Sequence, residues 1–150
     1  MTSQEIIDRL PYAYPFLFVD GITAINDDCV EGHFTYKKDL PFYAGHFKGH
    51  PMTPGVILTE TMAQIGLVAM GIYITHSDKA TIDDSQYNTI KIAMTSSSAD
   101  FFVPVLPGEK VVVKSKKEYF RFNKLKCKVE MYNKNNQLVC RGTISGMIKV

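Results

Sequence analysis

The sequence is poor in cysteine, and its cysteines form no recognisable framework. Cys29, Cys127 and Cys140 are an odd number, and no two of them have CxxC spacing. Neither disulfide cross-links nor a zinc ribbon is indicated, so we expect small buried or half-buried thiols in a reducing cytoplasm. The helical Glu-x-x-His arrangement of metal ligands is absent too, and we expect no metal site.

An excess of charge of one sign is also missing. Seventeen basic and 15 acidic residues leave a net charge of +2, which gives no indication of nucleic acid binding. The start of the chain lacks the basic segment, apolar run and small-residue cleavage site of an export signal, so we expect a cytoplasmic protein. With 150 residues and 45% hydrophobic content, residues 1–150 suit one compact core, and we expect a single domain.

Runs of β-branched and aromatic residues predict strands along much of the chain. The predicted strands are 16–25, 29–36, 110–121, 125–133 and 137–148, with turns at 26–28, at Asn123 and at 133–137. In 125–133, apolar and charged side chains alternate, so one face of the sheet should be buried and the other exposed to water. The buried face therefore needs a covering element.

The covering element is a predicted helix from Val56 to about residue 75, preceded by a loop rich in proline and glycine at 41–55. An apolar run of this length could also span a membrane, but it carries Glu60 and Gln64. An unpaired carboxylate in lipid costs roughly 2.5 to 3.5 kcal/mol, which argues against a membrane span. We expect an α+β architecture, a curved antiparallel sheet wrapped around this one long helix.

The residues around the start of this helix can support acid–base chemistry. His46 lies in the preceding loop, and Glu60 lies about one and a half turns into the helix. Between them, a Pro- and Gly-rich approach leads to the helix N-terminus, whose free N–H groups would suit an oxyanion. Proton removal next to a thioester carbonyl needs a base, donors on the carbonyl oxygen and an acid for a leaving hydroxyl. A lone loop histidine is more often a hydrogen-bonded surface residue, so this pattern alone leaves both interpretations open.

Ordered motifs over nearly the whole chain resemble the (3R)-hydroxyacyl-acyl carrier protein dehydratases of the FabZ type, which have the hot-dog fold. The motifs are Leu10-Pro11, Tyr14 to Asp20, Gly45 to Val56, Glu60 to Gln64 and Pro104 to Glu109. The longest, GHFKGHPMTPGV, is similar to the family pattern GHFPGxPxMPGV. The resemblance implies reversible dehydration of a 3-hydroxyacyl thioester on acyl carrier protein to the trans-2-enoyl thioester, in fatty acid or polyene synthesis, without a cofactor.

The same resemblance assigns roles to residues. It implies that His46 and Glu60 are catalytic, that N–H groups near Gly55 and Val56 bind the thioester carbonyl, and that Phe47 and Gln64 contact substrate or orient Glu60. A second Gly-His-Phe triplet contains His33, which should be an ordinary strand residue because no Pro-Gly turn and helix follow it. Glu60 in place of aspartate points away from FabA-type enzymes that also isomerise the double bond.

The sequence departs from the family pattern at two positions near the predicted site, and two alternative functions remain open. Lys48 stands where the family usually has proline and His50 where it commonly has arginine, which leaves carrier preference and acyl chain length undetermined. A hot-dog thioesterase, or a non-catalytic acyl-carrier-binding protein, would use the same fold.

The expected partners are an acidic acyl carrier protein and a second copy of the chain. Lys116, Lys117 and Arg121 belong to a basic stretch that could dock the carrier, although lysines that discourage edge pairing of strands would explain it equally well. The resemblance implies a homodimer in which His46 of one chain meets Glu60 of the other, with dimers often joined into larger assemblies.

Overall fold

The computed structural model describes residues 1–77 and 91–149, in which one antiparallel sheet covers a central helix. The sheet has six strands in the order β1-β2-β4-β5-β6-β3. The strands are β1 (Gly21–Ile25), β2 (Cys29–Thr35), β3 (Lys91–Phe101), β4 (Lys110–Arg121), β5 (Lys124–Asn133) and β6 (Leu138–Lys149). Two short helices, α1 (Ser3–Asp8) and the 3-10 turn η1 (Pro41–Ala44), flank this arrangement and contribute Ile6 and Tyr43 to the core.

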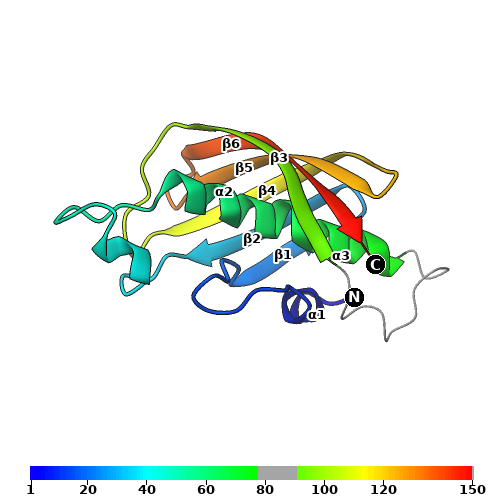
Figure 1. Ribbon diagram of the computed structural model, residues 1–150, viewed down its shortest axis with the longest axis horizontal. Helices are drawn as coiled ribbons and strands as arrows, with labels where there is room; N and C mark the ends of the chain where they lie inside the picture. Colours follow the sequence, from blue (N-terminus) through cyan, green and yellow to red (C-terminus); the bar gives the residue numbers. More distant parts are fainter. Residues whose placement is uncertain (78–90, 150) are drawn as a thin grey trace.

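The central helix runs without interruption from α2 (Gly55–Ala63) through a π-helical segment, η2 (Gln64–Val68), into α3 (Ala69–Ser77). It lies across one face of the sheet (Figure 1), and the described part of η2 is buried throughout. A Cβ added at Gly66 would lie 2.9 Å from Val129, so the glycine permits this close approach of helix and sheet. The Ser115 hydroxyl donates a hydrogen bond of 2.9 Å to the Gly66 carbonyl. The predicted α+β architecture is confirmed.

Gly55–His76 is long and apolar enough to cross a membrane by length and composition. However, 72% of its most apolar window is buried inside the protein. The core helix of a sheet-covered fold has the same composition, because it is enclosed on most sides. Its apolar character is therefore accounted for by the packing in Figure 1.

The first predicted strand, 16–25, is too long, because only Gly21–Ile25 pairs with β2. The backbone of 16–18 is bound instead by a side chain of the central helix. The Phe18 N–H donates to Gln64 Oε1 at 2.8 Å, and Gln64 Nε2 donates to the Phe16 carbonyl at 2.9 Å. A side-chain amide has thus replaced a neighbouring strand as the hydrogen-bond partner of this segment.

The sequence prediction missed β3, which pairs with β6 at the edge of the sheet. Its side chains are exposed or only partly buried along the whole strand. Because neither face is buried, the segment from Met94 to Ser98 lacks the alternation of apolar and polar residues by which half-buried strands are recognised.

The turns between the later strands lie where they were predicted. Phe122 and Asn123 have positive φ values of 51° and 59° and connect β4 to β5. Two of the three thiols are buried, as expected, and burial raises the pKa of Cys127 to about 11 and of Cys140 to about 12. Cys29 differs from the expectation, because it is exposed at the start of β2.

Candidate active site

The backbone of His46 is held on both sides by hydrogen bonds. Its N–H donates to the Phe42 carbonyl of η1 at 3.1 Å, and its carbonyl accepts from the Met52 N–H at 2.8 Å.

His46 and His50 are four residues apart, which on a helix would suit a metal. Here they lie in a turn, and no cluster of three potential metal ligands occurs among residues 1–77 and 91–149.

A hydrogen bond of the His46 ring determines which nitrogen can act as a base. Nδ1 lies 2.8 Å from the Met52 carbonyl oxygen, which can only accept. Nδ1 therefore carries the proton, and Nε2 of the neutral ring keeps a free lone pair. The Phe47 ring stacks on the imidazole with centroids 3.9 Å apart and itself remains half exposed.

The helix that carries Glu60 begins in an apolar cleft. Pro54 is the N-cap of α2 and provides no capping side chain, so the first N–H groups, at Gly55 and Val56, have no carbonyl partner within the helix. The cleft has a volume of about 350 Å³. It is lined by Met52, Thr53, Gly55, Leu58, Phe101, Phe102, Val103 and Pro104. Polar N–H groups at an apolar cleft suit a developing negative charge.

Glu60 is partly buried, and its surroundings favour the protonated form. Burial raises the pKa of Glu60, while a hydrogen bond from Gln64 opposes this by stabilising the carboxylate. Gln64 Nε2 lies 3.0 Å from Glu60 Oε1. A carboxyl group with a raised pKa can donate its proton to a leaving hydroxyl nearer neutral pH than an ordinary glutamate can.

Gln64 is fully buried and holds Glu60 to the chain around Phe18. One amide side chain accepts from the Phe18 N–H and donates to both the Phe16 carbonyl and Glu60. Gln64 is also the first residue of η2, where the helix widens. Wide helical turns of this kind are frequent at functional sites. The structure therefore brings together Glu60 and Gln64, as the sequence predicted.

Tyr12 is a neighbour of Glu60 that the sequence analysis missed. Burial and the negative charge of Glu60 raise the pKa of Tyr12 to about 12, so its phenol stays neutral at physiological pH. Its ring centroid lies 6.5 Å from that of Phe16. Tyr12 lies between the Leu10-Pro11 and Tyr14 to Asp20 motifs, and nothing in its type or spacing indicated a position beside the carboxyl group.

Among the described residues, no hydrogen bond or ring contact links His46 to Glu60 within one chain. The described contacts of His46 go to its own loop, and the described hydrogen bond of Glu60 goes to Gln64. His33, by contrast, lies in β2 opposite Gly21 and Val112, the position of an ordinary strand residue.

Comparison with known proteins gives the family. The model of the FabA-like domain matches residues 10–144. The chain belongs to the FabA-like domain family. Among the relatives of this FabA-like domain is the 3-hydroxyacyl-[acyl-carrier-protein] dehydratase FabZ of Ehrlichia canis, 32% identical over 97% of this chain and 94% of that protein. The protein of the same name from Sulfurovum sp. is 38% identical over 73% of this chain and 72% of the relative.

Solved structures share the fold of this FabA-like domain. The dehydratase heterocomplex ApeI:P from Xenorhabdus doucetiae has a TM-score of 0.75 at 15% identity, covering 96% of this chain and 91% of that one. A mutant thioesterase from Pseudomonas aeruginosa has a TM-score of 0.65 at 8% identity, covering 99% and 94%. Both likenesses concern the fold alone, and they confirm the hot-dog fold.

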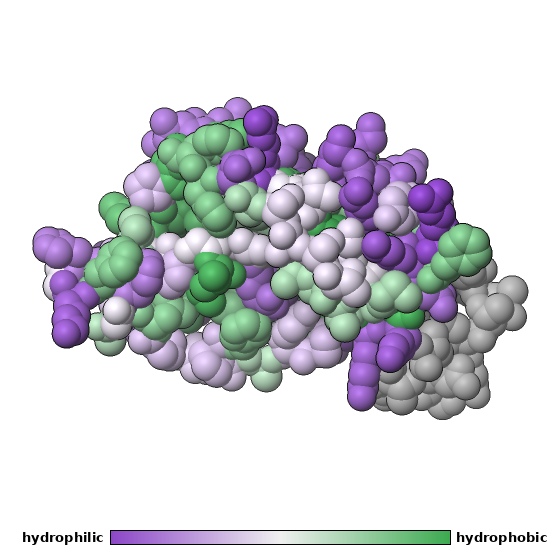
Figure 2. Space-filling view, turned by 45° about the horizontal axis from the view of Figure 1, so that its top comes forward, coloured by the Kyte–Doolittle hydropathy of each residue, from purple (hydrophilic) through white to green (hydrophobic). Residues whose placement is uncertain are grey.

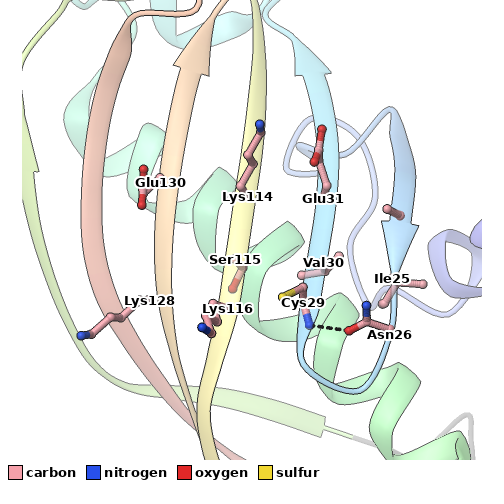
Figure 3. A pocket seen from close by; sticks show the side chains of 11 residues that line it. Ile25, Asn26, Cys29, Val30, Glu31, Lys114, Ser115, Lys116, Lys128 and Glu130 are labelled. Carbon is pink, nitrogen blue, oxygen red and sulfur yellow. Dashed lines mark hydrogen bonds between the residues drawn. The ribbon is translucent and has the colours of Figure 1, made fainter.

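The residues predicted to dock a carrier lie on the half of β4 that is distant from the His46 loop. Lys110 at the other end of β4 pairs with Thr35, whereas Lys116 pairs with Cys29. Lys116 lines a shallow pocket of about 400 Å³ on the sheet face opposite the helix (Figure 3). Lys117 Nζ is 3.7 Å from an Asp28 carboxylate oxygen.

Arg121, the third predicted docking residue, lies beside an aromatic ring. Its guanidinium lies 4.4 Å from the centroid of the Tyr119 ring. Carrier docking at Lys116, Lys117 and Arg121 therefore stays a prediction that rests on charge alone.

Proposed function

We propose that this FabA-like domain removes water from a (3R)-3-hydroxyacyl thioester on acyl carrier protein and releases the trans-2-enoyl thioester. The observation that carries the proposal is the combination of a histidine with a free Nε2 and a carboxyl group with a raised pKa. Such a pair can remove one proton and supply another. The FabZ relatives, which carry this activity in their names, support the same reaction.

In the proposed mechanism His46 Nε2 takes the proton from C2 of the substrate. Negative charge then develops on the thioester oxygen, where the N–H groups of Gly55 and Val56 stabilise it. Protonated Glu60 donates its proton to the C3 hydroxyl, the C3–O bond breaks, and water leaves as the C2–C3 double bond forms. One proton is removed and one is supplied, so the step needs no cofactor. The His46 imidazolium then gives its proton, directly or through water, to the Glu60 carboxylate, which restores both groups for the next turnover.

The working unit of the proposal is a homodimer in which His46 of one chain and Glu60 of the other share a site. β3 supports this, because in the described part of the chain it pairs with β6 alone and leaves its other edge free. Apolar side chains reach the surface near it (Figure 2), with Met94 47% and Phe101 48% exposed. A long free edge with apolar neighbours is suited to pairing with a second copy.

The cellular setting of the proposal is a cytoplasmic pathway of fatty acid or related polyene synthesis, in which residues 1–150 act as one domain. Dimers of this kind would allow larger assemblies through further contacts of equivalent surfaces.

Product analysis tests the proposed reaction. The purified protein is incubated with a 3-hydroxyacyl-acyl carrier protein, and the thioester is followed by its absorbance and by mass spectrometry. We expect an enoyl thioester that is lighter by one water. A free acid and a thiol would identify a thioesterase, and binding of the carrier without turnover would identify a non-catalytic protein.

A further inference from the structure

We propose that the turn after His46, which carries Lys48 and His50 at its tip, is part of the surface that docks the acidic carrier protein. This inference rests on the proposed function, because it names the partner of the same site. Lys48 stands where the family pattern has proline, and His50 occupies a variable position of that pattern where the family commonly has arginine.

The turn is tight and has a defined geometry. The Phe47 N–H donates to the His50 carbonyl at 3.0 Å, and the His50 N–H donates back to the Phe47 carbonyl at 3.1 Å. Gly49 occupies the left-handed region with φ of 72°, which favours glycine at the tip. Figure 1 shows this loop, which precedes α2, projecting beyond the end of the sheet. Its side chains are therefore available to a partner.

Lys48 is available because no described carboxylate neutralises it. Its side chain is exposed, and no ion pair joins it to an acidic residue within residues 1–77 and 91–149. Several lysines of the β4 and β5 stretch differ in this respect. Lys117 pairs with Asp28, and Lys126 and Lys128 lie 3.5 and 3.2 Å from Glu118.

The position of the turn connects docking to chemistry. Two residues span at most roughly 7 Å, so Lys48 is held close to His46 by the chain itself. The hydrogen bonds of His46 to Phe42 and Met52 make this connection stiff. A carrier bound at Lys48, with the side chain of His50 beside it, would present its acyl group next to His46. Exposed charges of this kind mainly accelerate and orient association.

Charge reversal at Lys48 tests the inference against a matched control. Lys134, in the turn between β5 and β6, is also exposed, and Lys134→Glu changes the total charge by the same amount. Each variant is assayed with one 3-hydroxyacyl group on holo acyl carrier protein, on coenzyme A and on pantetheine. We expect Lys48→Glu to lower kcat/KM for the carrier substrate roughly two- to tenfold more than for pantetheine, with Lys134→Glu showing no such selectivity.

The outcomes that overturn the inference are distinct. Equal losses on all three substrates would mean that the turn acts in the reaction itself. Losses shared by the carrier and coenzyme A substrates, but not by pantetheine, would mean that the turn binds the phosphate that those two substrates have and pantetheine lacks. A selective loss in the Lys116→Glu, Lys117→Glu, Arg121→Glu triple variant, with none in Lys48→Glu, would place docking on β4. Lys48→Met replaces the reversal if the first variant does not fold.

Binding measured without turnover separates this inference from the proposed function. The affinity of labelled holo acyl carrier protein is measured for the wild type and for Lys48→Glu at low and high salt. A weaker and less salt-dependent interaction in the variant supports docking even if no enoyl product forms. An unchanged affinity refutes docking at the turn even if the enzyme dehydrates its substrate.

Discussion

At His46, one hydrogen bond to a backbone carbonyl fixes the chemistry available to the ring. The Met52 carbonyl holds Nδ1 as the donor and leaves Nε2 as the acceptor. Glu60 is the proposed complementary group, because burial raises its pKa above that of an ordinary glutamate. The motif predicted both residues, but only the structure distinguishes the free nitrogen and the desolvated carboxyl group.

The first prediction concerns these two side chains. We expect His46→Ala and Glu60→Gln each to lower kcat for dehydration by roughly 10² to 10⁴-fold, because each removes a general acid or base. Circular dichroism and thermal melting should show that both variants still fold. His33→Ala is the control from the other Gly-His-Phe triplet and should turn over near the wild-type rate. An essential His33 with a dispensable His46 would mean that the wrong triplet was chosen.

The second prediction concerns the pH dependence of turnover. In the proposed mechanism Glu60 must be protonated to act as an acid, so we expect activity to fall at high pH. Gln64→Leu removes the donor that stabilises the Glu60 carboxylate, which raises the pKa of Glu60 further. We therefore expect the alkaline limb of the kcat profile to move to higher pH.

Gln64→Leu should also destabilise the fold. The buried Phe18 N–H loses its partner, which costs roughly 1 to 3 kcal/mol, and the Phe16 carbonyl loses a part-buried hydrogen bond as well. Thr61→Val is the matched control, because it removes a buried hydroxyl that bonds Tyr36 and not Glu60. It should lower the melting temperature without moving the alkaline limb. An alkaline limb of Gln64→Leu that moves to lower pH would contradict the role of Gln64.

At the scale of elements, the sequence predicted the parts that have one strong pattern. The helix from Val56 was recognisable because its residues are apolar on nearly every side, and β5 because buried and exposed residues alternate along it. β3 was not predicted because its side chains are exposed or only partly buried, so its sequence lacks an alternating apolar pattern. Residues 16–20 were wrongly predicted as strand because their composition is strand-like, whereas the backbone of Phe16 and Phe18 is hydrogen-bonded to the Gln64 side chain. Sequence spacing does not reveal a hydrogen-bond partner so far along the chain.

The third prediction concerns the free edge of β3. Met94→Lys places a charge in an exposed apolar position on this strand, and lysines on edge strands oppose pairing. We expect a shift from dimer to monomer in sedimentation experiments, with a parallel loss of dehydration because the proposed site takes residues from two chains. Phe122→Lys makes the same change at an exposed residue in the turn between β4 and β5 and should leave the dimer intact. A monomeric wild type, or a fully dimeric Met94→Lys variant, would contradict pairing through this edge.

At the scale of the whole molecule, two observations on the described residues bear on the proposed dimer. The edge of β3 lacks a neighbour in the described structure, and the contacts of His46 and Glu60 do not reach each other. In the proposed dimer, a second chain paired along β3 would extend the sheet and bring its Glu60 to His46 of the first chain. Because a twofold axis makes both chains equivalent, each dimer would contain two identical sites.

Complementation between two inactive variants tests this shared site most directly. Equal amounts of His46→Ala and Glu60→Gln chains are unfolded, mixed and refolded, and enoyl thioester formation is measured. Random pairing makes about half of the dimers mixed, and one site of each mixed dimer has both native groups, so we expect roughly a quarter of wild-type activity if the sites are independent. Activity that stays at the level of the separate variants, while native mass spectrometry detects mixed dimers, would place both groups on one chain and contradict the account.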